Sequence, residues 1–162
     1  MMKKISKERS VLIEEVGLII EERADLSPLA ARIYASLILA SDTGLTFDNI
    51  SEAHQASKSA VSTNLKVLVR LKYVEYHTKF GERKRYFRAS KFYVKTAMEK
   101  YNELFEREIA IVDKINNFNK ENNPEKFEEE KSIGAIYKES LYHLSEGFKK
   151  RIEQVEALEK LS

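Results

Sequence analysis

The sequence predicts a mainly α-helical protein that contains one small β-hairpin. Only five glycines and two prolines occur in 162 residues, so few positions interrupt a helix. Apolar residues recur at helical spacing through most of the chain. One stretch, residues 73–88, is instead rich in β-branched and aromatic residues with partial alternation. The length fits one domain of ordinary size.

The N-terminal part of the chain predicts two helices. Residues 6–24 place apolar side chains at helical spacing and form the first. Ser27 can cap a second helix, and Pro28 fits its first position because the missing N–H costs nothing there. We expect this helix to continue to about Ser41, where Asp42-Thr43-Gly44 supplies a glycine stop.

Two further helices and a hairpin follow. Thr46 caps a short helix over 47–54, and Ser57 caps a helix that runs to about Lys72. The helix capped by Ser57 has one apolar face, which comprises Ala60, Val61, Leu65, Leu68 and Val69. Its opposite face carries only hydroxyl and cationic side chains, namely Lys58, Ser59, Ser62, Thr63, Lys66 and Arg70. Strands over 73–80 and 83–88, joined by a turn at Gly81-Glu82, complete a winged helix-turn-helix.

Charge is distributed unevenly along the chain and favours an anionic partner for its middle. Residues 55–91 hold ten basic and two acidic side chains, a net charge of +8, whereas the segments before and after each carry −3. The helix that begins after Ser57, with its hydroxyl and cationic face, can enter the major groove of double-stranded DNA. The basic hairpin can reach neighbouring phosphates. The candidate DNA-binding residues are Ser57, Lys58, Ser59, Ser62, Thr63, Lys66, Arg70, Lys79, Arg83, Lys84 and Arg85.

The C-terminal part predicts two long amphipathic helices, separated by a break at Asn122-Asn123-Pro124. The first spans 91–119 and the second begins at Ser132, so each is about 28 residues, or roughly 40 Å, long. Because the middle segment is too small to cover these apolar stripes, we expect a homodimer. The candidate dimerisation residues are Leu12, Val16, Ile19, Tyr101, Phe105, Val112, Leu141, Leu144, Phe148, Ile152 and Val155.

These elements predict three segments with different roles. Residues 1–26 form an N-terminal helix that supports the dimer, and residues 27–90 form the DNA-binding domain. Residues 91–162 form the helical dimerisation region.

The phrase SKSAVSTNLKVLVRLKYVEYHTKFGERKRYFRAS, residues 57–90, resembles MarR-type winged-helix transcription regulators, and most of all their GbsR branch. The resemblance implies a homodimeric regulator, usually a repressor, on a pseudo-palindromic operator. It further implies a small-molecule effector, of unidentified chemistry, that releases DNA by changing the spacing of the two recognition helices. Two positions depart from the pattern: the wing lacks the Asp that often precedes its key Arg, and Lys72-Tyr73 stands where a glycine often ends the recognition helix.

Other classes of function receive little support. The chain has no cysteine, which excludes disulfides and thiolate metal sites, and His54, His77 and His143 lack metal-ligand spacing. With no phosphate loop, nucleophile elbow or HExxH motif, we expect neither an enzyme nor a cofactor. Without a transmembrane stretch or a signal peptide, the expected location is the cytoplasm and no membrane partner is expected. Two alternatives stay open: a winged-helix protein–protein adaptor and a non-specific architectural DNA-binding protein.

Overall fold

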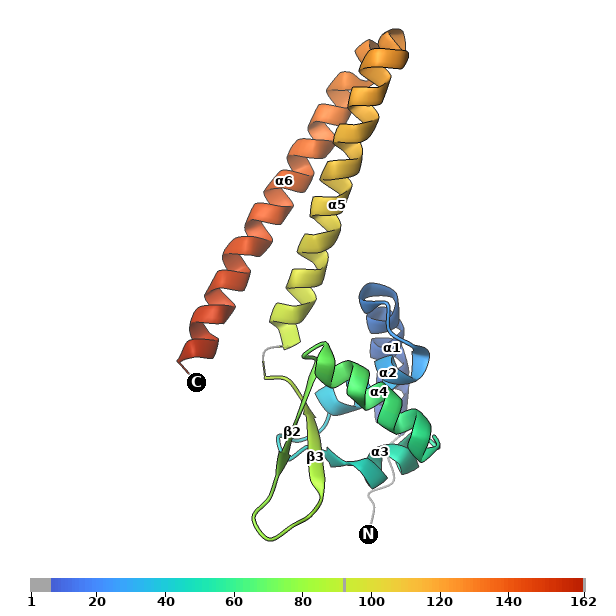
Figure 1. The fold of residues 1–162 in the computed structure, drawn as a ribbon, viewed down its shortest axis with the longest axis vertical. Coiled ribbons are helices and arrows are strands. Elements are labelled where there is room, and N and C mark those ends of the chain that lie inside the picture. The colour runs from blue at the N-terminus through green and yellow to red at the C-terminus, as the bar shows by residue number, and fades with distance from the viewer. Residues whose placement is uncertain (1–6, 92, 162) are drawn as a thin grey trace. The chain divides into compact units, whose positions relative to one another are not determined.

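A computed structural model describes residues 7–91 and 93–161, which divide into two units. Over these described residues, the first unit, which ends at Tyr93, contains four helices and three strands, whereas the second is built from two long helices (Figure 1). The fold is therefore mainly α-helical with a small antiparallel sheet, as the sequence predicts. Ser6, the expected start of the first helix, lies outside the described residues.

Helix α2 (Pro28–Ile38) forms the centre of the first unit. Almost every residue of α2 after its first turn is buried, because α1 (Lys7–Ala24) and α4 (Lys58–Arg70) pack against it. The helical apolar periodicity of these segments thus produces one shared hydrophobic core. The largest fully buried side chains of this core are Tyr34, Tyr73, Ile33, Ile50, Leu68 and Val61.

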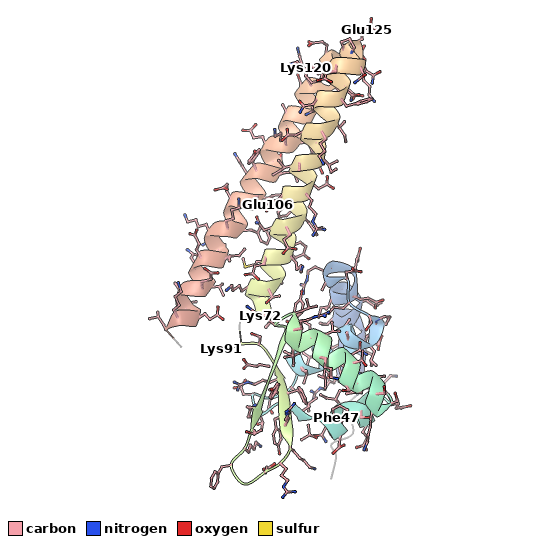
Figure 2. The ribbon with its side chains drawn as sticks, in the orientation of Figure 1. Phe47, Lys72, Lys91, Glu106, Lys120 and Glu125 are labelled. Carbon is pink, nitrogen blue, oxygen red and sulfur yellow. The ribbon has the colours of Figure 1, made fainter. Side chains whose placement is uncertain are left out.

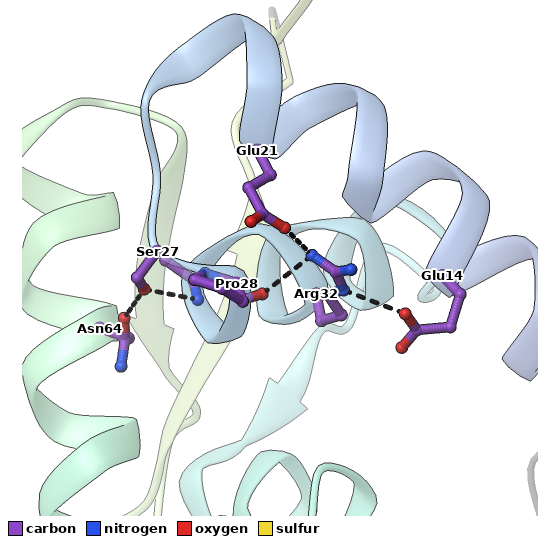
Figure 3. Close-up of polar contacts among 7 residues, drawn as sticks. Glu14, Glu21, Ser27, Pro28, Arg32 and Asn64 are labelled. Carbon is purple, nitrogen blue, oxygen red and sulfur yellow. Dashed lines mark hydrogen bonds and ion pairs between the residues drawn. The ribbon is translucent and has the colours of Figure 1, made fainter.

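An ion-pair network joins α1 to α2 (Figure 3). The Nε of Arg32 lies 3.2 Å from a carboxylate oxygen of Glu14, and its Nη1 pairs with Glu21. The same Nη1 also approaches the carbonyl oxygen of Pro28 at 3.5 Å. The hydrogen bond to Glu21 is the main cause of a raised pKa for Arg32. Because the guanidinium is largely buried, these contacts compensate for the water that it loses.

Side-chain caps start three helices of the first unit, as the sequence predicts. Ser27 and Ser57 each accept a hydrogen bond from the backbone N–H three residues later. Thr46 and Asn49 form a reciprocal capping box at the start of the third helix. The Ser27 hydroxyl also donates to the Oδ1 of Asn64 at 2.6 Å, which ties the start of α2 to α4 (Figure 3).

A tight turn connects α3 (Phe47–Ala53) to α4. Gln55 adopts a left-handed conformation with φ +48°, which allows the Ala56 N–H to reach the Ser51 carbonyl at 3.1 Å. The Ser51 hydroxyl donates in return to the Ala56 carbonyl at 2.7 Å. These bonds fix the angle between the two helices of the helix-turn-helix.

The sheet has three strands, although the sequence analysis predicts only the two of the hairpin. β2 (Val74–Thr78) and β3 (Arg85–Ala89) form the hairpin, with Tyr76 opposite Phe87. The unpredicted strand β1 (Leu45–Thr46) pairs antiparallel with β3, so the order is β1-β3-β2. Two residues are too short to show an alternating pattern, and for that reason β1 carries no sequence signal.

Gly44 serves this sheet rather than ending α2. The helix ends at Ile38 and not near Ser41, so the expected glycine stop is wrong. Gly44 has φ +76°, and a Cβ at this position would lie 2.2 Å from the carbonyl oxygen of Phe87. Only glycine therefore permits the close approach of β1 to β3.

The second unit is an antiparallel hairpin of α5 (Tyr93–Asn122) and α6 (Pro124–Lys160). The Ser145 hydroxyl donates to Asn102 at 2.8 Å, and ion pairs connect the helices at several levels along their length. Figure 2 labels Glu106 midway along α5, and Lys120 and Glu125 on the two sides of the bend.

Helix α6 begins eight residues earlier than the sequence analysis predicts. The apolar stripe predicts a start at Ser132, which would leave residues 125–131 outside the helix. Instead Pro124 occupies the first helical turn, where proline is favoured, and the acidic run 128–130 lies within α6 on exposed positions. The predicted break at Asn122-Asn123-Pro124 therefore exists, but it is a single bend and not a loop that extends to Ser132.

Polar and apolar residues share the seam between α5 and α6. Phe148 contacts the rings of Tyr101 and Phe105, with centroids 5.9 and 5.5 Å apart, whereas Lys138 and Asp113 form an ion pair across the seam. Many large apolar side chains of the hairpin are exposed, including Leu104, Ile111, Ile115, Phe118, Ile133, Ile136, Tyr137 and Leu144. The hairpin by itself therefore covers only part of its apolar surface.

No helix in the ranges 7–91 and 93–161 combines the length and hydropathy needed to cross a bilayer.

Candidate nucleic-acid interface

Helix α4 presents its hydroxyl and cationic face to solvent. Its apolar residues Val61, Leu65 and Leu68 are buried in the core, so the opposite side of the helix must point outward. On that side the predicted residues are exposed, except for the half-buried Ser62; they are Ser57, Lys58, Ser59, Ser62, Thr63, Lys66 and Arg70. The amphipathic pattern of α4 thus determines which residues a partner can reach.

The tip of the β2–β3 hairpin, called the wing from here on, is a hydrogen-bonded turn. The Glu82 N–H donates to the Lys79 carbonyl at 3.0 Å, and Gly81 at the third position has φ +80°. These features define a type II turn, in which glycine is favoured at that position. The turn places Phe80 at the end of the wing with its side chain fully exposed.

Tyr86 on β3 holds both sides of this turn. The Nζ of Lys79 lies 4.1 Å from the centre of the Tyr86 ring, and the Tyr86 hydroxyl donates to a Glu82 carboxylate oxygen at 2.5 Å. That hydrogen bond is the main cause of a raised pKa for Tyr86. His77 stacks on the same ring, with centroids 5.7 Å apart. The Tyr86 ring is therefore the centre of a cluster on the face of the wing that lies away from α4.

The other face of the wing carries an arginine on an aromatic platform. The Arg85 guanidinium lies 4.7 Å from the centre of the Tyr76 ring, which itself contacts Phe87 at 6.0 Å. In contrast, Arg88 pairs with Glu75 at 2.7 Å on the opposite face. Strand alternation thus places the two arginines on opposite faces: Arg85 has no carboxylate partner among the described residues, whereas Arg88 is neutralised by Glu75.

A groove of about 540 Å³ lies between α4 and the wing. Its apolar floor includes Phe47, Leu65, Tyr76 and Phe87. Its rim brings together five of the predicted residues from two elements: Ser62, Lys66, Arg70, Arg83 and Arg85. Among the residues that the structure describes, none of Lys66, Arg70 and Arg83 forms an ion pair with a carboxylate. The groove is thus a concave surface with uncompensated positive charge.

The remaining predicted DNA-binding residues lie outside the groove. Ser57, Lys58, Ser59 and Thr63 occupy the exposed N-terminal part of α4. Lys84 is exposed near the wing tip, whereas Lys79 is half-buried against Tyr86.

Neither the aromatic floor of the groove nor the structural role of Asn64 is predicted by the sequence pattern. The alternation along β2 and β3 places Tyr76 and Phe87 on the same face of the hairpin. However, the packing of α4 over that face depends on the tertiary structure, which the sequence pattern does not show. The Asn64 side chain donates to the Ala60 carbonyl at 2.8 Å and accepts from Ser27, so it orients α4 from within the first unit. Its place among hydroxyl and cationic residues gives no sign of that structural role.

The candidate dimerisation residues have mixed exposure. On α1, Leu12 and Ile19 are exposed, whereas Val16 is half-buried against the core. On the hairpin, Tyr101 and Leu144 are exposed and Leu141 is buried. The others are half-buried, namely Phe105, Val112, Phe148, Ile152 and Val155. Part of the predicted set therefore packs within the chain, as the contact between Phe105 and Phe148 demonstrates.

Within the described ranges, no group of three or more His, Asp and Glu side chains is placed to hold a metal ion.

Comparison with known proteins agrees with this geometry. Residues 31–90 match a family described as a winged helix DNA-binding domain. The crystal structure of a transcriptional regulator is similar with a TM-score of 0.60, at 18% identity over 93% of this chain and 99% of that chain. S. aureus MepR in a DNA complex gives a TM-score of 0.44, at 19% identity over 67% and 93%. No curated protein matches the chain. The family match and the first structure show the winged helix fold.

Proposed function

We propose that this chain is a sequence-specific regulator of transcription that binds double-stranded DNA. The observation that carries the proposal is the groove between α4 and the wing, where four cations surround a concave surface. Phosphates neutralise such charge, and their positions along a duplex suit a helix flanked by a hairpin. The match of residues 31–90 to a winged helix DNA-binding domain supports the same reading.

The proposed mode of binding assigns different roles to the two elements. The N-terminal part of α4 enters the major groove, where the hydroxyls of Ser59 and Thr63 donate to or accept from base edges. Lys58 and Lys66 neutralise phosphates on either side. Arg83 and Lys84 of the wing contact the DNA backbone next to the major groove that α4 occupies. This division predicts that substitutions of Ser59 and Thr63 alter sequence preference, whereas substitutions of the cations on α4 and the wing mainly affect affinity.

We further propose a homodimer that binds a pseudo-palindromic operator. The apolar residues exposed on α1 and on the hairpin support this assembly, because a second copy of the chain would bury them. Two recognition helices would then contact half-sites one turn of B-DNA, about 34 Å, apart. The resemblance to the GbsR branch of MarR-type regulators favours repression in the cytoplasm. An effector that prefers another spacing would release the DNA by a population shift.

Selection of binding sites from a random DNA pool, followed by anisotropy titrations, tests the proposal. We expect an inverted repeat with half-sites about 10 bp apart, bound at least about 10³-fold more tightly than scrambled DNA. Weak, salt-sensitive binding without enrichment of any sequence would instead favour an architectural DNA-binding protein. Absence of binding even at low salt would contradict DNA recognition and favour an adaptor for an acidic protein.

A further inference from the structure

The wing tip exposes an aromatic side chain that contributes nothing to the core. Phe80 is fully exposed, whereas the other aromatic residues of the wing lie against a neighbouring ring or cation. Water around a free phenyl ring is unfavourable, and the fold gains no packing from this residue. The position therefore suits contact with a partner better than it suits the isolated chain.

The structure fixes the backbone turn that carries this side chain. The type II turn fixes the backbone on both sides of Phe80, and Gly81 supplies the positive φ that the turn needs. Tyr86 then secures the residues that flank the tip, through the Lys79 ammonium over its ring and its hydrogen bond to Glu82. A preorganised tip loses little conformational freedom on binding.

The charge around Phe80 indicates the chemistry of the partner. Arg83 and Lys84 are exposed within four residues of it, so the partner is anionic and offers an apolar slot between its charges. The minor groove of DNA has this combination, because phosphates line its edges and stacked bases form its floor. The same wing also supplies Arg83 and Arg85 to the groove beside α4, so Phe80 belongs to the surface already proposed to face DNA.

We propose that Phe80 acts as a wedge that inserts from the minor groove at a base step next to each half-site. Partial unstacking of that step would kink the duplex and bring more of the backbone to the wing cations. Pyrimidine–purine steps unstack most easily, so Phe80 adds a sequence preference at a position that α4 does not contact. This inference rests on the proposed DNA-binding function.

The test uses the full chain and the selected duplex, with 2-aminopurine replacing adenine at single steps beside the half-site. Wild-type protein is expected to raise 2-aminopurine fluorescence at one step. Phe80→Ala should abolish that increase and weaken binding about tenfold, with a preserved thermal melting curve because the side chain is exposed. Phe80→Trp should retain the increase. Arg83→Ala should weaken binding yet retain the increase at saturation, since it removes charge but not the wedge.

Specific outcomes overturn the inference without affecting the proposed function. Equal affinity and equal fluorescence for wild type and Phe80→Ala, with normal DNA binding by both, would exclude a wedge. Loss of binding to phosphatidylserine-containing vesicles by Phe80→Ala, with unaltered DNA binding, would assign the tip to a lipid surface and also overturn it. If the wild-type protein bound no DNA at all, the proposed function itself would fail.

Discussion

Lys72 lies just after the end of α4 (Figure 2), and its backbone has a conformation that ordinarily favours glycine. Its φ is +62°, its N–H donates to the Val69 carbonyl at 3.0 Å, and the Tyr73 N–H donates to the Leu68 carbonyl at 3.0 Å. This is the Schellman arrangement, with a lysine at the left-handed position. The departure from glycine noted in the sequence therefore changes the side chain but leaves the helix stop intact.

Substitution of Lys72 by glycine should stabilise the first unit. Glycine adopts a positive φ without the steric cost that a Cβ brings, so Lys72→Gly should be about 1 kcal/mol more stable than Lys72→Ala. Both variants lose the same charge, so their difference isolates the backbone conformation. Urea denaturation of the two proteins provides the measurement. A Lys72→Ala protein as stable as Lys72→Gly would contradict the strain argument.

We expect His54 to make the stability of the first unit depend on pH. Its Nε2 lies 3.1 Å from the Ser36 hydroxyl, which itself donates to the Ile33 carbonyl at 2.8 Å, so Nε2 is the donor toward Ser36. Burial is the main cause of a lowered pKa for His54. The His54 imidazole is therefore protonated at a lower pH in the folded chain than in the unfolded chain, where it is protonated at about pH 6.5.

Stability should consequently fall as the pH drops through about 6.5 toward the lower pKa of folded His54, because the unfolded state binds more protons in that interval. His54→Gln should flatten this dependence in urea denaturation measured from pH 7.5 to 5. His143→Gln, at an exposed position on α6, is the matched control and should retain the wild-type slope. An unchanged slope in His54→Gln would show that another group is responsible.

At the scale of elements, signals within a few residues of sequence predict most of the fold. The caps at Ser27, Thr46 and Ser57 and the apolar face of α4 are local, and the structure contains each of them. Strand β1 and the start of α6 were missed for opposite reasons. β1 exists only because β3 pairs with it, whereas the highly charged first turns of α6 lack the apolar stripe by which a helix is recognised.

The pairing of β1 with β3 depends on Gly44, and a pair of glycine substitutions tests this dependence. Gly44→Ala should lower the free energy of unfolding by at least about 2 kcal/mol, because the new Cβ would overlap the Phe87 backbone. Gly147→Ala is the matched control, since a Cβ there meets nothing within 4 Å and alanine favours the interior of α6. It should raise stability by up to about 1 kcal/mol. Equal effects of the two substitutions on denaturation midpoints would contradict the close approach.

At the scale of the whole molecule, the exposed apolar surface is the main argument for assembly. That the long helices need a partner is predictable from the sequence, because their apolar stripes exceed what one small unit can cover. The same pattern gives no order of preference among these stripes. It could not predict which apolar residues pack within the chain, since both helices carry more than one apolar face. Phe105 and Leu141 prove to be partly or fully covered inside the hairpin, whereas Leu144 and Ile136 are exposed.

Leu144→Glu should dissociate the proposed dimer. A carboxylate buried between two copies would be left without a partner, whereas on a free monomer it would be solvated. Sedimentation velocity should detect a monomer with an unaltered helical circular dichroism spectrum, and DNA affinity should fall by about 10²-fold or more as one half-site is lost. His143→Glu changes the adjacent exposed residue, about 100° around the helix axis from Leu144, and is expected to remain dimeric. A dimeric Leu144→Glu would exclude this face from the interface.

The claim that α4 and the wing together bind DNA is tested most directly by anisotropy titration of the selected duplex across a range of salt concentrations. Wild type is compared with Lys66→Ala, Arg83→Ala and the double variant. Each substitution should weaken binding and reduce the slope of log K against log salt by about 2, because the homodimer loses one phosphate contact in each of its two copies. The dimer should stay intact and the two effects should add. Retention of wild-type affinity and slope by the double variant would contradict the account, because DNA would then bind elsewhere on the protein.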